Sequence, residues 1–231
     1  MKILAVDSSA KACSAAVLDD DKILGSFFIN TALTHSQTLV PMIDAVLKNT
    51  STDIISIDAF AVSAGPGSFT GVRIGVAAIK GMAMPLNKPC IAVSTLGAMP
   101  HNIISENCIA ACVMDARCNQ VYNALFEIEN GKITRLCDDR AISIDDLAED
   151  LKQYNKKIIL VGDGAQLCYN SIKENNNKVE LAPEIARYQN ASGVALASVN
   201  KEQISCDELL PAYLRLPQAE RELKKRMENK K

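Results

Sequence analysis

Residues 1–29, MKILAVDSSAKACSAAVLDDDKILGSFFI, contain three apolar runs separated by short polar turns. The runs cover 2–7, 13–18 and 23–29, and short aliphatic runs of this kind are typical of β-strands. The acidic turn at 19–21 separates the second run from the third, as expected for a hairpin. The opening of the chain therefore predicts three consecutive strands.

The rest of the first half alternates helix and strand. Thr34 can cap a helix, and Gln37 would complete a capping box. After that helix we expect, in order, a strand at 59–64, a helix at 71–84, a strand at 90–94 and a helix at 95–104. The first half thus has the order βββαβαβα.

The second half repeats this order. We expect strands at 108–114, 120–127, 132–136, 157–161 and 178–181, and helices that begin near Ser143, Ala165 and Ser192. Two turns also align, Val6-Asp7-Ser8-Ser9 with Met114-Asp115-Ala116-Arg117 and Gly65-Pro66-Gly67 with Gly162-Asp163-Gly164. The sequence therefore predicts a duplicated α/β fold with lobes at 1–105 and 106–231, and with Asp7 and Asp115 facing each other across a cleft.

Composition and charge narrow the class of protein. Hydrophobic residues make up 48% of the chain and charged residues 23%, as in ordinary globular proteins. The formal net charge is −2 and Trp is absent, so neither charge nor base stacking favours a nucleic-acid reader. No apolar run approaches the roughly 20 residues of a membrane span, and the start of the chain lacks a signal-peptide pattern. We therefore expect a cytoplasmic protein.

The eight cysteines form no C-x-x-C pair. Five lie in apolar runs, where we expect reduced and buried thiols: Cys13, Cys90, Cys108, Cys112 and Cys168. The basic residues between Arg221 and Lys231 are interpreted as a solvated terminal segment, with contact to RNA as the alternative.

Polar turns at the ends of two strands suggest a nucleotide site. Ser8 and Ser9 offer hydroxyls and amides for phosphate, and Asp7 could hold a metal–phosphate through water. The second lobe would contribute the turns Asp115-Ala116-Arg117 and Gly162-Asp163-Gly164-Ala165, with Asp115, Gly162 and Gly164 as the expected site residues. The alternative is that Asp7 and Asp115 satisfy amides of their own turns.

The stretch Gly65-Pro66-Gly67-Ser68-Phe69-Thr70-Gly71 fits neither standard phosphate-binding template. A Walker A loop needs Gly-Lys-Ser/Thr, whereas Val72 and Arg73 follow Gly71. A dinucleotide fingerprint needs glycine in place of Thr70 and an acidic residue about 20 positions later. The stretch therefore predicts a tight turn and a helix cap.

The helix at 71–84 carries few charges and several glycines, which cost about 1 kcal/mol each relative to alanine in a helix. We expect it to dock another chain together with the helix at 34–48, and a helix enclosed within its own lobe is the alternative. The expected interface residues are His35, Leu39, Met42, Ile43, Val46, Val72, Gly75, Val76 and Ile79.

The two histidines argue against metal chemistry. One turn after His35 stands Leu39 instead of a second ligand, and His101 has no obvious nucleophile as partner. No Gly-x-Ser-x-Gly elbow is present. We therefore expect no metal site and no catalytic residue.

Several motifs resemble the TsaB family of the bacterial tRNA threonylcarbamoyladenosine machinery. They are Val6-Asp7-Ser8-Ser9, Thr34-His35-Ser36-Gln37, the run from Ala64 to Gly75, and Pro211-Ala212-Tyr213-Leu214-Arg215. The resemblance covers residues 1–215 and is strongest before residue 98.

The resemblance implies an actin/hexokinase-like (ASKHA) fold and a non-catalytic scaffold that binds the catalytic paralogue TsaD, with the ATPase TsaE joining. It implies a homodimer when TsaD is absent, and we expect only an indirect relation to tRNA. We expect no required cofactor, and whether ATP or ADP still binds is left open at this point. Two rival interpretations remain, an ASKHA phosphotransferase that uses Asp7 or Asp115 and a metal-dependent peptidase.

Overall fold

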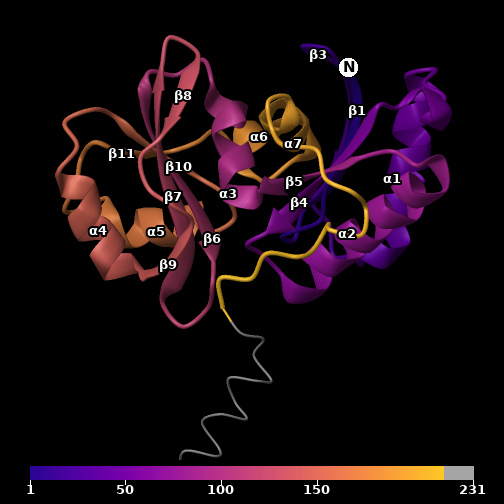
Figure 1. The fold of residues 1–231 in the computed structure, drawn as a ribbon. Coiled ribbons are helices and arrows are strands. Elements are labelled where there is room, and N and C mark those ends of the chain that lie inside the picture. Colours follow the sequence, from indigo (N-terminus) through magenta and orange to yellow (C-terminus); the bar gives the residue numbers. More distant parts are fainter. Residues whose placement is uncertain (216–231) are drawn as a thin grey trace, which may run out of the picture.

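Two mixed β-sheets organise the computed structural model, which describes residues 1–215 (Figure 1). The first sheet has the strand order β3-β2-β1-β4-β5. Its strands are β1 (Lys2–Asp7), β2 (Cys13–Asp19), β3 (Lys22–Ile29), β4 (Ala59–Gly65) and β5 (Cys90–Ser94). β1 pairs with β2 antiparallel and with β4 parallel, so the opening hairpin and the later helix–strand units share one sheet.

Helices cover both faces of this sheet. α1 (His35–Asn49) and α2 (Phe69–Ala83) lie on one face, where their apolar side chains form a core with alternate residues of β1, β2 and β4. α7 (Ala191–Ser198) covers the other face. Because it is enclosed on both faces and both edges, β1 is buried along its length after Lys2.

The second sheet has the order β11-β10-β6-β7-β8, with β9 also paired to β7. Its strands are β6 (Cys108–Asp115), β7 (Gln120–Glu129), β8 (Lys132–Arg135), β9 (Arg140–Ser143), β10 (Ile158–Val161) and β11 (Val179–Leu181). One face packs against α4 (Ile144–Lys152) and α5 (Ala165–Ile172), and the other against α3 (Thr95–Ala98), a 3₁₀ turn at Met99–Ile103 and α6 (Glu184–Arg187). The central strand β6 again has an antiparallel and a parallel neighbour.

The predicted duplication and the α/β fold class are confirmed, because the two sheets have the same strand order about β1 and β6. Two like sheets with helices on their faces agree with the actin/hexokinase-like (ASKHA) fold that the resemblance implies. The boundary near residue 105 separates the sheets, but assigning everything after it to the second lobe is wrong. α7 returns to the first sheet, while α3 lies at the junction and contacts strands of both sheets, with Ala98 in the first core and Leu96 in the second.

Local differences from the expectations have simple causes. Thr34 precedes α1, but its side chain makes no capping hydrogen bond, so the capping box is absent. α2 begins at Phe69, where the Ser68 hydroxyl accepts from the Gly71 amide. The helix expected at 95–104 is one α turn followed by a 3₁₀ turn that begins at Met99-Pro100, because proline cannot donate to an α-helical ladder. β9 was not predicted.

The five cysteines expected in apolar runs are all buried free thiols. Over residues 1–215, no helix has the length and apolar character needed to cross a membrane. The basic residues from Arg221 onward lie outside the described residues.

Candidate functional site

A cleft of about 490 Å³ lies between the lobes. The first lobe contributes Ser9, Ala10 and Lys11 after β1, together with residues 66–69. The second lobe contributes residues 114–117, Tyr122 and Asp163, and residues 212–215 complete the lining. The predicted cleft therefore exists, and its volume is in the range of small-molecule pockets.

Asp7 does not reach this cleft. Its side chain is 1% exposed, and three donors occupy its carboxylate. The amide and hydroxyl of Ser9 donate to Oδ1 at 2.9 and 2.7 Å, and the Ser63 hydroxyl donates to Oδ2 at 2.7 Å. Burial raises the pKa of Asp7, although these hydrogen bonds oppose the rise. The prediction that Asp7 faces the cleft and holds a metal–phosphate is wrong, and the alternative of a turn aspartate describes it.

The Ser8 side chain is also buried and makes its hydrogen bond within the first lobe. It is 1% exposed, and its hydroxyl donates to the Gly71 carbonyl at 2.9 Å. Ser9 lines the cleft, but its hydroxyl is the one that donates to Asp7. Of the three residues predicted on this side, Ser9 is therefore the one placed at the cleft.

On the second lobe, Asp115 lines the cleft as predicted. Its carboxylate accepts from the Arg117 amide at 2.8 Å and lies 3.6 Å from the Arg117 guanidinium. Residues 117–119 all have positive φ, so the turn after β6 is left-handed. Asp115 thus shares its carboxylate between its own turn and the cleft.

Gly162 and Gly164 are not part of the cleft lining. A Cβ on Gly162, whose φ is +115°, would collide with the Val113 carbonyl, and one on Gly164 would lie 3.0 Å from the Asp115 amide nitrogen. Gly162 therefore requires glycine, and Gly164 leaves little room for a side chain, because the chain passes close to the end of β6. The structure therefore gives these two glycines a role in the turn, and nucleotide binding by them stays a prediction.

Asp163, which the sequence offered only as part of the Gly162–Ala165 turn, is the residue of that turn that lines the cleft. Gln189, itself 2% exposed, donates to Asp163 Oδ1 at 2.8 Å. Burial raises the pKa of Asp163, and the nearby Asp115 carboxylate raises it further. The Gly-Asp-Gly pattern was the available signal, because Gly162, with its positive φ, turns the chain sharply just before the aspartate.

The cleft holds charges of both signs. Lys11, Arg117 and Arg215 supply cations to its lining, opposite the carboxylates of Asp115 and Asp163. Phe69, Tyr122 and Tyr213 add aromatic surface. Such a lining can bind a small anionic or planar ligand, but the described residues place no hydroxyl or thiol beside a free base in the way that nucleophilic catalysis requires.

His35 makes a structural contact at the start of α1. Its Nε2 bonds the Ala10 carbonyl at 2.7 Å, and its buried Nδ1 has no partner. Leu39, one turn later, is 1% exposed. Within residues 1–215, no three potential metal-ligand side chains gather at one place.

The predicted interface residues lie inside the first lobe, apart from the half-buried His35. The buried residues pack α1 and α2 against the sheet: Leu39, Met42, Ile43, Val46, Val72, Gly75, Val76 and Ile79. A Cβ on Gly75 would lie 2.6 Å from Ser8 Oγ, so this glycine makes room for a hydroxyl of its own lobe. The prediction that these residues form an exposed docking surface is wrong, and the alternative of internal packing describes their inward face.

Different residues of the same helices face outward. Arg73, Ala77 and Gly81 of α2 are exposed, as is Val40 of α1, whose exposed fraction is 61%. A Cβ on Gly81 would meet nothing within 4 Å. The outer face of the helix pair thus carries Arg73 and the exposed Asp44–Lys48 ion pair, and it contains one glycine without an internal role.

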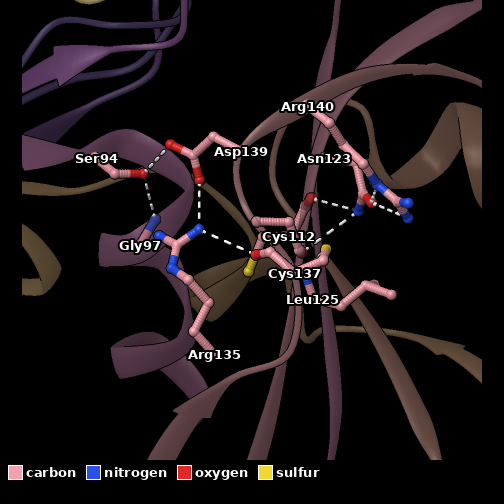
Figure 2. A network of polar contacts seen from close by, with 10 residues as sticks. Ser94, Gly97, Cys112, Asn123, Leu125, Arg135, Cys137, Asp139 and Arg140 are labelled. Carbon is pink, nitrogen blue, oxygen red and sulfur yellow. Dashed lines mark hydrogen bonds and ion pairs between the residues drawn. The ribbon is translucent and has the colours of Figure 1, made fainter.

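Polar contacts also join the lobes away from the cleft lining (Figure 2). The Ser94 hydroxyl, at the end of β5, donates to Asp139 Oδ2 at 2.5 Å and accepts from the Gly97 amide at 3.0 Å. Arg135 of β8 donates to the other Asp139 oxygen at 2.7 Å. The start of α3 is therefore tied to the second sheet by an ionic network.

Comparison with known proteins places the chain in a family. The model described as TsaD, tRNA N6-adenosine threonylcarbamoyltransferase, matches residues 24–223. The tRNA threonylcarbamoyladenosine biosynthesis protein TsaB of Bacillus subtilis (strain 168) is 29% identical over 95% of this chain and 96% of its own length. The TsaB protein of Escherichia coli (strain K12) is 32% identical over 72% of this chain and 73% of its own.

Solved structures agree. A crystal structure from Pseudomonas aeruginosa, of a protein described as similar to the peptidase YeaZ, is 26% identical. It superposes with a TM-score of 0.79 over 93% of this chain and 99% of its own. Together with the duplicated fold and the quoted motifs, these similarities show that the chain belongs to the TsaB family of tRNA threonylcarbamoyladenosine biosynthesis proteins.

Proposed function

We propose that this chain is a non-catalytic subunit in the synthesis of threonylcarbamoyladenosine in tRNA, and that it acts by binding the catalytic relative TsaD. In this proposal it supplies no reacting group and instead stabilises or activates its partner. The match to the TsaD family model supports a pair of related chains that associate through similar faces. Contact with tRNA is then indirect, through the complex.

The outer face of α2 carries the proposal. Arg73, Ala77 and Gly81 are four residues apart, so they form one exposed stripe. Glycine in a helix costs about 1 kcal/mol relative to alanine. Since nothing within 4 Å of Gly81 requires this glycine, a partner backbone that packs directly on the stripe would account for it.

Apolar side chains near the stripe support the same surface. Val40 on α1, Leu33 just before it and Met84 just after α2 are exposed by 61, 59 and 56%. α1 and α2 pack beside each other on the sheet, so these side chains and the stripe belong to one helical layer. We call Leu33, Val40, Arg73, Ala77, Gly81 and Met84 the outer helix face.

A non-catalytic role is also supported by the state of Asp7. A phosphotransferase of this fold would need a carboxylate near the transferred phosphate, and Asp7 is enclosed by Ser9 and Ser63. The rival phosphotransferase therefore depends on Asp115 or Asp163. Calorimetric titration with ATP and a coupled assay for turnover would identify that rival, and metal analysis of the purified chain would identify the peptidase.

The proposal includes a cytoplasmic complex with TsaD and TsaE, and a homodimer through the outer helix face when TsaD is absent. It requires no cofactor. Any residual binding of ATP or ADP in the cleft would use the cations of Lys11, Arg117 and Arg215 for phosphate, in place of the enclosed Asp7 and Ser8.

The first test is to mix the purified chain with TsaD and measure the mass of the species by size-exclusion chromatography with light scattering. A species with the mass of a complex, together with loss of the separate peaks, is expected. Separate elution of both chains at micromolar concentration would contradict the proposal.

A further inference from the structure

Residues 204–215, which we call the C-terminal strap, return across the first lobe after α7 (Figure 1). Ile204 pairs with Cys90 on the edge strand β5 through two backbone hydrogen bonds of 2.8 and 2.9 Å. Leu209 is 0% exposed and belongs to the core under α1 and α2. The first part of the strap is therefore an integral part of the first lobe.

The strap next reaches the mouth of the cleft. The Ala212 amide donates to the Ala64 carbonyl at 2.7 Å, at the end of β4. A Cβ on Gly65, whose φ is +127°, would collide with the Ala212 carbonyl. The glycine at position 65 thus admits the strap backbone against β4.

Tyr213 fixes the strap to the start of α2. Its ring stacks on Phe69 with the centroids 5.1 Å apart. The Arg73 guanidinium lies 3.8 Å from the Phe69 centroid, and its Nε donates to the Tyr213 hydroxyl at 2.7 Å. Stacked rings and a cation above them each contribute beyond their buried area, so this cluster is a firm anchor.

Arg215 then crosses to the other lobe. Its Nη1 donates to the Ala116 carbonyl at 3.0 Å, and Ala116 belongs to the turn after β6. Residues 212–215 also form one wall of the cleft. Every earlier anchor of the strap is on the first lobe, so a movement that separates the lobes must break the contact between Arg215 and Ala116.

We propose that the C-terminal strap is a clasp that holds the cleft between the lobes closed, with Arg215 as its catch. Two-lobed proteins close and open by movement about a few connecting segments. Here the Ser94–Asp139 contact (Figure 2) ties the lobes beside the covalent connection between β5 and β6. The hydrogen bond from Arg215 to Ala116 ties them at the cleft. Release of the catch frees the second lobe to move and exposes the cleft lining. The proposal concerns this chain alone and does not depend on any partner.

The test measures the width of the cleft with two nitroxide labels. One is attached to the native Cys118, which is exposed in the turn after β6, and the other to Lys11→Cys on the first lobe. Cys137→Ser and Cys206→Ser are included in every sample, because these thiols are half-buried and could also react. Dipolar distance distributions are recorded with Arg215, with Arg215→Ala and with Arg215→Gln. Arg117→Ala serves as the matched control, since Arg117 lines the same cleft but contacts its own lobe.

Loss of one hydrogen bond to a charged group commonly changes a two-state equilibrium about ten-fold. We therefore expect the population with longer distances to increase about ten-fold in Arg215→Ala and Arg215→Gln, and to stay unchanged in Arg117→Ala. Hydrogen exchange at the Ala212 amide is measured in parallel. Faster exchange at Ala212 with unchanged distances would overturn the proposal, because the strap would then cover the first lobe without holding the second. No change in either measurement would overturn it as well.

Discussion

The Ser63 hydroxyl donates a 2.7 Å hydrogen bond to the Asp7 carboxylate, and this contact joins β4 to the end of β1 inside the first lobe. Ser9 completes the environment of the carboxylate with two further donors. The aspartate that the sequence suggested for phosphate binding is thus part of the core. The ionisation of Asp7 is therefore expected to change the stability of the folded protein and not the binding of a ligand in the cleft.

Asp7→Asn tests this structural role. Burial raises the pKa of Asp7 in the folded protein above its ordinary value of 3.8, so the folded state binds this proton more tightly than the unfolded state. Relative to the variant, which does not titrate, the parent should gain stability as the pH falls through that raised pKa, and the gain should be complete below 3.8. Urea unfolding of both proteins between pH 7 and pH 4 measures the difference. A difference that is constant over this range would contradict a raised pKa.

Two glycines of α2 should respond in opposite directions to alanine. Gly81→Ala should raise the free energy of unfolding by about 1 kcal/mol, because the new methyl group meets nothing and the helix loses a poor helix former. Gly75→Ala should destabilise by about 1–3 kcal/mol, because its Cβ would lie 2.6 Å from Ser8 Oγ. Denaturant titrations of the purified chain check both signs. Stabilisation by Gly75→Ala would show that this glycine has no internal role.

Gly65→Ala should release the strap. The position has a φ of +127°, and a Cβ there collides with the Ala212 carbonyl, so both strain and contact oppose the substitution. We expect faster hydrogen exchange at the Ala212 amide and a loss of about 1–3 kcal/mol of stability. Gly131→Ala is the comparison, since it also has positive φ but meets nothing within 4 Å. Equal rates of hydrogen exchange at the Ala212 amide in the two variants would contradict the role of Gly65 in making room for the strap.

Ser94→Ala should weaken the junction between the lobes. It removes a helix cap, which typically costs about 1 kcal/mol, and it takes one donor from Asp139. Because Arg135 still neutralises Asp139, we expect a total loss of about 1–2 kcal/mol without unfolding. Thermal and urea unfolding of the parent and Ser94→Ala measure this loss of stability. Ser94→Thr keeps the hydroxyl and should retain most of the stability.

The order of elements and the duplication could be predicted because short apolar runs and turn residues are local features. The opening hairpin and the matching turns after β1 and β6 are recognisable without tertiary information. β9 was missed because its four residues carry too short a pattern. The return of α7 to the first sheet and the contact of α3 with both sheets depend on long-range packing, which no local pattern records.

The sequence could not predict the direction in which the side chains of the site residues point. A glycine such as Gly75 or Gly81 shows that something must come close, but only the fold shows whether that is Ser8 or a partner. In the same way, Asp7 and Asp115 occupy matching turns, yet one is enclosed by hydroxyls and the other lines the cleft. Equivalent sequence positions therefore do not imply equivalent exposure in the two lobes.

The central claim is that the outer helix face binds TsaD, and the affinity of Gly81→Glu for TsaD tests it most directly. Gly81 is exposed and its Cβ position is open, so the variant should fold normally by circular dichroism. Leu167→Glu on α5 is the control, because it places the same charge at an exposed position of the second lobe. We predict about a hundred-fold weaker binding of TsaD by Gly81→Glu, as expected when a charge enters the centre of an interface, and unchanged binding by Leu167→Glu. Equal affinity of the parent and a folded Gly81→Glu variant would contradict the account.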